Sequence, residues 1–177
     1  MTAGLLLAAL AASTVANAVD PSAGHVQGMC TDGSTVYISQ ATRLTKVDAE
    51  GRVLAATNVV NHTGDVCLWD GKVFTAVAAR EGVHKGRGVI QVFDTNLVFL
   101  TEREFPNRLD GITCLDGKLY VGEAKEGGHA AHRGNSILRV DAKTLKAEYR
   151  REIDHGFATY HGVQNAATDG HRLYFCF

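Results

Sequence analysis

Polar side chains that can bind a ligand or a metal ion stand directly before four apolar runs of the chain. These four leading segments are residues 24–28, 61–65, 107–111 and 160–165. The ligand-binding candidates in them are Gln27, Asp65, Asp110, Gln164 and Asn165, and the metal-binding candidates are His25, His62 and His161. Imidazoles and carboxylates that converge from separate segments are the donors of transition-metal and calcium sites. Because histidine titrates near neutral pH, the same set could also carry out acid–base chemistry.

Two longer insertions share a second polar pattern. One reads Glu-Gly-Val-His-Lys-Gly-Arg-Gly over residues 81–88, and the other reads Glu-Gly-Gly-His-Ala-Ala-His-Arg-Gly over residues 126–134. Each begins Glu-Gly-x-His and reaches Arg-Gly within a few residues. Glu81 and Glu126 are therefore further ligand candidates, and the candidates for handling substrate charge and protons are His84, Arg87, His129 and Arg133.

A structural role is the alternative for every one of these groups. The Glu and Arg of an insertion could form an ion pair across a solvated hairpin, which stabilises a protein by about 0–1 kcal/mol. The polar groups of the leading segments could cap loop backbone through hydrogen bonds. A binding site is favoured by their joint occurrence in segments that the predicted fold brings to one face.

The elements that must position these residues form a repeat. Asp-Gly pairs predict tight hairpin turns, and they begin at Asp32, Asp70, Asp116 and Asp169. An aromatic residue follows each pair, at Tyr37, Phe74, Tyr120 and Tyr174. Asp48, Asp94 and Asp141 end the next run, at intervals of 46 and 47 residues (94 − 48 and 141 − 94). This period predicts repeated units of four antiparallel strands.

The predicted fold class is therefore all-β, a β-propeller of four-stranded antiparallel blades, with a β-sandwich as the alternative. The expected blades are residues 25–61, 62–106 and 107–154, followed by a partial blade at 155–177. We expect about three and a half blades of a six- to seven-bladed propeller, because only ring closure removes the sheet edges. In a propeller the leading segments and the loops between strands two and three lie on one face, around the central channel.

The composition indicates one soluble globular domain. The chain has 177 residues, of which 45% are hydrophobic and 21% charged, and its formal net charge is −1. This balance argues against nucleic-acid binding. The sequence contains no phosphate-binding loop, nucleophile elbow or Cys-x-x-Cys pair, so we expect no nucleotide cofactor. The four cysteines are expected to be buried core residues without disulfides; they are Cys30, Cys67, Cys114 and Cys176.

The N-terminus has the features of an export signal. Residues 1–18 form a short apolar run that ends in small residues, and we expect a secretory signal peptide cleaved after Ala18. Residues 19–24 are the expected linker, and residues 25–177 the expected propeller. The predicted location is extracytoplasmic, either periplasmic or secreted, with no membrane span after removal of the signal.

The blade sequence resembles a known superfamily. Residues 109–122 (LDGITCLDGKLYVG) and 136–147 (SILRVDAKTLKA) look like the repeats of the NHL and gluconolactonase-like propellers, which include calcium-dependent phosphotriesterases and are typically six-bladed. The resemblance implies a divalent metal at the channel mouth, with Asp110 and Asn165 at comparable positions. The Glu-Gly that opens the first blade of gluconolactonases is absent here. The histidine-rich leading segments are more similar to propeller lyases that hold a metal through His or Gln.

Two functions follow from these patterns. The first is an exported propeller that binds a small molecule, glycan or protein on the histidine-rich channel face. The second is a metal-dependent lyase or hydrolase, similar to lactonases and phosphotriesterases or to polysaccharide and peptide lyases. It would hold one divalent ion (Ca, Zn or Mn) through His25, His62 and His161, with Gln27 and Gln164 as further ligands.

Overall fold

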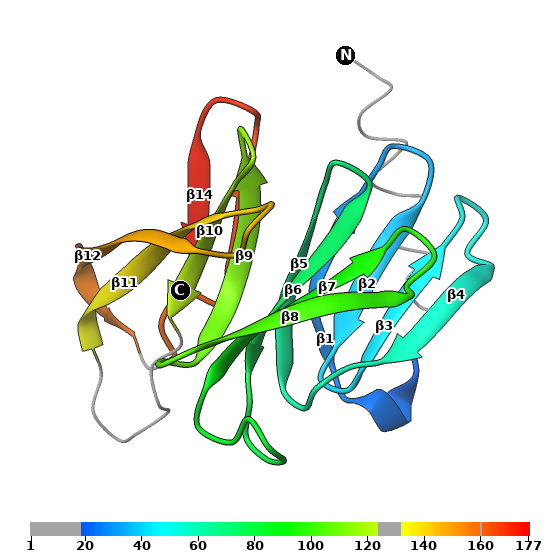
Figure 1. Cartoon of the computed structure of the whole chain (residues 1–177), viewed down its shortest axis with the longest axis horizontal. Coiled ribbons are helices and arrows are strands. Elements are labelled where there is room, and N and C mark those ends of the chain that lie inside the picture. The colour runs from blue at the N-terminus through cyan, green and yellow to red at the C-terminus, as the bar shows by residue number, and fades with distance from the viewer. Residues whose placement is uncertain (1–18, 124–131, 160) are drawn as a thin grey trace.

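Three four-stranded antiparallel sheets and one two-stranded hairpin make up the computed structural model, which describes residues 19–123, 132–159 and 161–177. The side chains of residues 132, 133 and 155 are not part of that description. The sheets follow one another along the chain and stand side by side, the first coloured blue to cyan, the second green and the third yellow-green to orange (Figure 1). The predicted signal peptide lies outside the described residues.

Each sheet is a meander whose strands occur in sequence order. The first sheet contains β1 (Val26–Thr31), β2 (Val36–Gln40), β3 (Arg43–Val47) and β4 (Val53–Asn58). The second contains β5 (Thr63–Trp69), β6 (Lys72–Ala78), β7 (Gly88–Asp94) and β8 (Phe99–Phe105). The third contains β9 (Leu109–Leu115), β10 (Lys118–Glu123), β11 (His132–Asp141) and β12 (Ala147–Thr159). The hairpin contains β13 (Asn165–Thr168) and β14 (Leu173–Cys176).

The recurrent Asp-Gly pairs make two kinds of turn. In the second and third sheets both turn residues have positive φ, 48° and 67° at Asp70 and Gly71 and 52° and 71° at Asp116 and Gly117. Two such residues form the short hairpin that matches the twist of its strands. The other two turns are longer: the Asp32 carboxylate accepts from the amides of Ser34 and Thr35, and that of Asp169 from those of His171 and Arg172.

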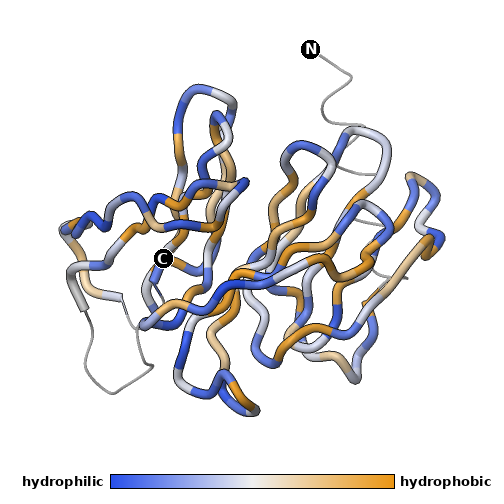
Figure 2. Tube along the Cα trace, in the orientation of Figure 1, coloured by the Kyte–Doolittle hydropathy of each residue, from blue (hydrophilic) through white to orange (hydrophobic). Residues whose placement is uncertain are grey.

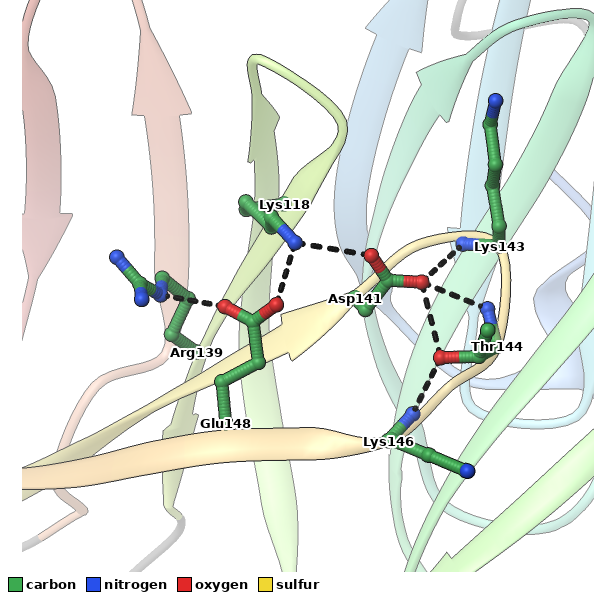
Figure 3. Close-up of polar contacts among 7 residues, drawn as sticks. All are labelled: Lys118, Arg139, Asp141, Lys143, Thr144, Lys146 and Glu148. Carbon is green, nitrogen blue, oxygen red and sulfur yellow. Dashed lines mark hydrogen bonds and ion pairs between the residues drawn. The ribbon is translucent and has the colours of Figure 1, made fainter.

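The aspartates that recur at intervals of 46 and 47 residues all close the turn between strands three and four. Each carboxylate accepts backbone amide hydrogens from the following residues, as Asp141 does from Lys143 at 3.2 Å and Thr144 at 2.9 Å. Figure 3 shows that Asp141 also pairs with Lys118 at 2.9 Å, and that Lys118 reaches Glu148. This part of the repeat is structural.

The core lies between successive sheets; hydrophobic segments follow the inner strands, whereas many turns, much of β12 and part of β8 are hydrophilic (Figure 2). Between the first and second sheets, Tyr37 and Leu44 pack with Val66 and Phe93. A larger cluster joins the second sheet to the third and includes Phe74, Ile90, Ile112 and Leu138. Because each sheet buries its faces against its neighbours, the first strands β1, β5, β9 and β13 are brought into contact in turn. This is the arrangement around a propeller axis.

Three details differ from the sequence prediction. The third sheet continues to Thr159 rather than residue 154, because β12 pairs with β11 as far as His132. The predicted linker 19–24 contains a 3-10 turn, Pro21–Ala23, and Gln40 fastens it to the first sheet by donating to the carbonyls of Asp20 and Gly24. All four cysteines are free, as predicted, but of the four only Cys67 is buried: Cys30 and Cys114 are half-buried, and Cys176 on the hairpin is exposed.

Candidate functional site

The first strand of each sheet is bulged at the same place. The pairing of β1 with β2 shifts between Val26 and Gly28, and that of β5 with β6 shifts between Thr63 and Val66. The pairing of β9 with β10 shifts where residues 110 and 111 face a single residue, Gly122. Bulges are frequent beside functional sites, where they redirect a side chain. The redirected residues here include Gln27, Asp65 and Asp110.

Strand register places most of the ligand candidates in two layers near the beginnings of the first strands. The repeated aromatics pair with Cys30, Cys67, Thr113 and Ala167 of the first strands. The residues two positions before these in the chain form the lower layer: Gly28, Asp65, Gly111 and Asn165. The residues three positions before them form the upper layer: Gln27, Gly64, Asp110 and Gln164. We call the two layers together the channel mouth. The Asn165 side chain donates to the Gln27 carbonyl at 2.6 Å, so the hairpin meets the first sheet here.

Asp65 connects three units of the fold at the channel mouth. It is 3% exposed, and its carboxylate accepts from the amides of Val66 at 2.8 Å, Ile112 at 3.2 Å and Ala166 at 2.8 Å. One side chain of the second sheet therefore holds both the third sheet and the hairpin. Burial raises the pKa of Asp65 to about 6, although these hydrogen bonds oppose the rise.

Asp110 is buried without a comparable set of donors. It is 8% exposed, and no hydrogen bond or ion pair to its carboxylate occurs within the described residues. Its Oδ1 atom lies against Gly64, where an added Cβ would be only 2.0 Å away. Burial and the nearby Asp65 raise the pKa of Asp110 to about 7, and the charge of Arg80 opposes the rise. Asp110 is thus a buried acid poised near neutrality.

The raised pKa of Asp110 predicts a pH-dependent difference in stability. An acid whose pKa is raised by folding stabilises the folded protein fully at pH values below its usual pKa of 3.8. This stabilisation is lost as the pH rises from there through the folded-state pKa of about 7. Asp110→Asn removes the titration. Its free energy of unfolding, relative to the wild type, should therefore rise by roughly 2–3 kcal/mol between pH 5 and pH 8. Urea unfolding at the two pH values measures this, and a constant difference would contradict it.

Basic side chains act electrostatically on His62, which lies in the leading segment of the second sheet. His62 is half-buried, and burial together with the charges of Arg80, His25 and Arg108 lowers its pKa. The charge of Arg80 also opposes the rise in the pKa of Asp110. Sequence reasoning missed Arg80 and Arg108. The signal for Arg80 was its position two residues after the end of the apolar strand β6 (Lys72–Ala78).

The predicted trio of histidine metal ligands is only partly brought together. His25 lies near His62, whereas His161 is exposed and has no part in the shift of His62. Within residues 19–123, 132–159 and 161–177, no group of three or more His, Cys, Asp and Glu side chains is arranged to hold a metal ion. Metal binding therefore remains a prediction.

The described insertion, residues 81–88, faces the outermost strand of its sheet. His84 contacts Glu102 through Nε2 at 2.9 Å and Glu104 through Nδ1 at 3.1 Å, and Arg87 pairs with Glu104 at 3.1 Å. These carboxylates raise the pKa of His84. Glu81 is exposed, and Arg87 pairs with Glu104 on β8 rather than with Glu81. In the second insertion, Glu126, His129 and the Arg133 side chain lie outside the described residues.

Two cavities adjoin the first strands. One, of about 350 Å³, lies between β1 and the hairpin and is lined by Gln27, Asp65, Asn165 and Tyr174, among others. The Gln27 Nε2 atom is buried and has no hydrogen-bond partner within the described part of the chain. The other cavity, of about 230 Å³, lies at the far end of the strands and includes Cys30, Cys67 and Cys114. Gln27 thus adds an unused donor to the channel mouth.

Comparison with known proteins supports the fold. No protein-family model and no curated protein sequence matches the chain. The WD40 domain of Pan2 from Neurospora crassa superposes with a TM-score of 0.66 at 8% identity, over 90% of this chain and 44% of that one. Glutaminyl cyclase from Myxococcus xanthus gives 0.63 at 9% identity, over 87% and 62%. BamB from Moraxella catarrhalis gives 0.57 at 14% identity, over 83% and 38%.

All three similar structures are β-propellers, which confirms the predicted all-β propeller of four-stranded antiparallel blades. The chain spans between 38% and 62% of their lengths. At these identities the likeness concerns the fold alone, and it does not single out NHL or gluconolactonase-like propellers. None of the helices in the described residues has the length and apolar character needed to cross a membrane.

Proposed function

We propose that this propeller binds a ligand at its channel mouth, where a polar group of a small molecule, glycan or protein enters between the first strands. The observation that carries the proposal is Asp110, a residue that is 8% exposed and whose carboxylate has no hydrogen-bond donor in the described residues. Burying a carboxylate without a partner is strongly unfavourable, and buried polar groups in proteins are generally hydrogen-bonded. A ligand that supplies the donor would remove this penalty.

The surroundings of Asp110 support a binding role over a purely structural one. Asp65 resembles a structural acid, because backbone amides from three successive units satisfy it. Asp110 differs from Asp65 in lacking such donors, and it lies next to Asp65 and near Arg80. Acids with strongly shifted pKa values and a specific charged neighbour concentrate at functional sites. Export to the periplasm or beyond remains part of the proposal, and cell fractionation of the tagged full-length protein tests it.

A metal-dependent lyase or hydrolase is the second candidate, and it is favoured by the electrostatic influence of the Asp65 carboxylate on that of Asp110. Asp110 and the amide oxygens of Gln27, Gln164 and Asn165 are oxygen donors of the kind that calcium prefers. His25 and His161 are exposed and less suited to a shared ion. Elemental mass spectrometry of the purified protein decides the point: about one equivalent of calcium, zinc or manganese that Asp110→Asn loses would favour this candidate.

The binding proposal predicts that Asp110 mediates stabilisation by ligand. A library of small polar metabolites and oligosaccharides, screened by thermal unfolding at pH 7, should contain compounds that raise the Tm of the wild type. A ligand present at 100 times its Kd stabilises by about 2.7 kcal/mol, which is several degrees for a domain of this size. Asp110→Asn should lose the shift.

Asp32→Asn is the matched control, because Asp32 is an exposed hairpin aspartate remote from the channel mouth, and this variant should retain the shift. Equal stabilisation of Asp110→Asn and the wild type would contradict the proposed site. A screen in which no compound raises the Tm of either protein would contradict it as well.

A further inference from the structure

The cavity of about 230 Å³ at the far end of the first strands holds most of the sulfur in the chain. Its wall includes the thioether of Met29 and the thiols of Cys30, Cys67 and Cys114. The whole sequence has only two methionines and four cysteines. Thiols and thioethers are soft donors, which soft metal ions prefer to oxygen. We call this space the sulfur cavity.

The strands β5 and β9 form one wall of the sulfur cavity and stay in contact along its length. They are neighbours in the fold (Figure 1). Near their beginnings, the Asp65 carboxylate accepts from the Ile112 amide at 3.2 Å. Near their ends, Gly117 lies against the Trp69 ring, which an added Cβ would approach to 3.0 Å. Both contacts join residues in the same chain order, so the two strands run in the same direction.

Cys67 and Cys114 lie between these two contacts and face each other. Each comes two residues after the first contact, so they share one level of the interface. Successive side chains of a strand point to opposite faces. Val66 and Leu68 pack between the first and second sheets, so Cys67 points towards the third sheet, where it belongs to the second core cluster. Cys114 packs against that same cluster from β9.

The third thiol of the cavity is separated from this pair. Cys30 packs with Val66 in the cluster between the first and second sheets, on the opposite side of β5 from Cys67. Cys176 is exposed on the hairpin and does not line the cavity. Cys67 and Cys114 are therefore the two thiols that a single ion could join.

We propose that Cys67 and Cys114 form a two-sulfur site for a soft monovalent cation of the Cu(I) type. Thiolate ligands select Cu(I), and this ion accepts as few as two of them. Each thiol gives up its proton when its sulfur binds the cation. Zinc and calcium need more donors, and residues 19–123, 132–159 and 161–177 contain no metal-binding group of three or more His, Cys, Asp and Glu side chains.

A core role alone explains less of this arrangement. A buried cysteine can serve simply as a small apolar residue. That role requires neither a facing thiol at the same level nor a cavity with further sulfur atoms on its wall. Asp110 does not line the sulfur cavity, so this site is separate from the proposed ligand site and does not depend on it.

A Cu(I) titration of the reduced, full-length protein under nitrogen tests the inference, with the chromogenic chelator bathocuproine disulfonate as competitor. The wild type should take up one equivalent of Cu(I) and should not bind zinc in a parallel titration. Cys114→Ser should weaken Cu(I) binding by roughly 100-fold, because it removes one of two ligands. Cys67→Ser should do the same, and the half-buried position of Cys114 keeps the test valid even where the buried Cys67→Ser fails to fold.

Cys176→Ser is the matched control and should leave Cu(I) affinity unchanged. A wild type that takes no Cu(I) from the chelator, or a folded Cys114→Ser that keeps the wild-type affinity, would overturn the inference. A loss in Cys30→Ser as large as that in Cys114→Ser would show that the pair is wrongly assigned. Equal affinity for zinc would refute the soft-cation class. A protein that ignores Cu(I) but joins Cys67 to Cys114 in a disulfide on mild oxidation would replace the metal site with a redox pair.

Discussion

Asp65→Ala is expected to lower the free energy of unfolding by about 3 kcal/mol at pH 7, because each buried donor left without a partner costs roughly 1–3 kcal/mol. The substitution frees the amides of Val66, Ile112 and Ala166, which belong to the second sheet, the third sheet and the hairpin. Relief from burying the carboxylate offsets part of this loss. Chemical denaturation monitored by the fluorescence of Trp69 measures the change, since Trp69 ends β5 on the same strand.

Asp32→Ala is the control for this prediction. The Asp32 carboxylate also accepts backbone amides, from Ser34 and Thr35, but the turn is exposed and water can replace the aspartate. Asp32→Ala should lower the free energy of unfolding by about 1 kcal/mol. If Asp65→Ala were no more destabilising than Asp32→Ala, the idea that one buried carboxylate joins three units would be wrong.

Gly64→Ala is the second change with a large expected effect, a loss of about 2–3 kcal/mol in the free energy of unfolding. The new Cβ would lie 2.0 Å from Asp110 Oδ1, 2.9 Å from its carbonyl oxygen and 3.1 Å from its Cα. Rotation of the Asp110 side chain relieves only the first contact, so β9 must also shift away from β5. The variant should therefore lose the ligand-induced rise in Tm together with stability.

Gly134→Ala is the matched control, because its added Cβ would approach only the carbonyl oxygen of Ile153, at 3.2 Å. We expect its stability to change by less than about 1 kcal/mol. A Gly64→Ala protein as stable as Gly134→Ala, with ligand stabilisation intact, would show that Asp110 does not pack against β5 as described.

The repeat was readable from the sequence because its positions have fixed local tasks. Asp48, Asp94 and Asp141 each close the same turn, and Asp70-Gly71 and Asp116-Gly117 each form a two-residue hairpin. Such tasks depend on neighbours within a few residues, so spacing alone reveals them. The same spacing predicted that Gln27, Asp65, Asp110, Gln164 and Asn165 share one face of the propeller. Strand register divides them between two layers, Asp65 and Asn165 in one and Gln27, Asp110 and Gln164 in the other.

The division of roles among these residues could not be read from the sequence. Asp65 and Asp110 look alike in their segments, and only the bulges decide that Asp65 receives three amides while Asp110 receives none of the described donors. The insertion containing His84 and Arg87 also carried no sign of its partners, because Glu102 and Glu104 belong to β8, about 20 residues later. Long-range pairing of this kind depends on how strands align.

The titration of the Asp110 carboxyl group tests the central claim most directly. In protein labelled with ¹³C at aspartate side chains, the resonance that disappears in Asp110→Asn identifies Asp110, and its shift can be followed from pH 3 to pH 9. A midpoint near 7 is predicted, because the acid is buried beside Asp65 without a donor among the described residues. A midpoint near the ordinary value of about 4 would mean that the group is solvated or already paired, and it would contradict a binding site built around Asp110.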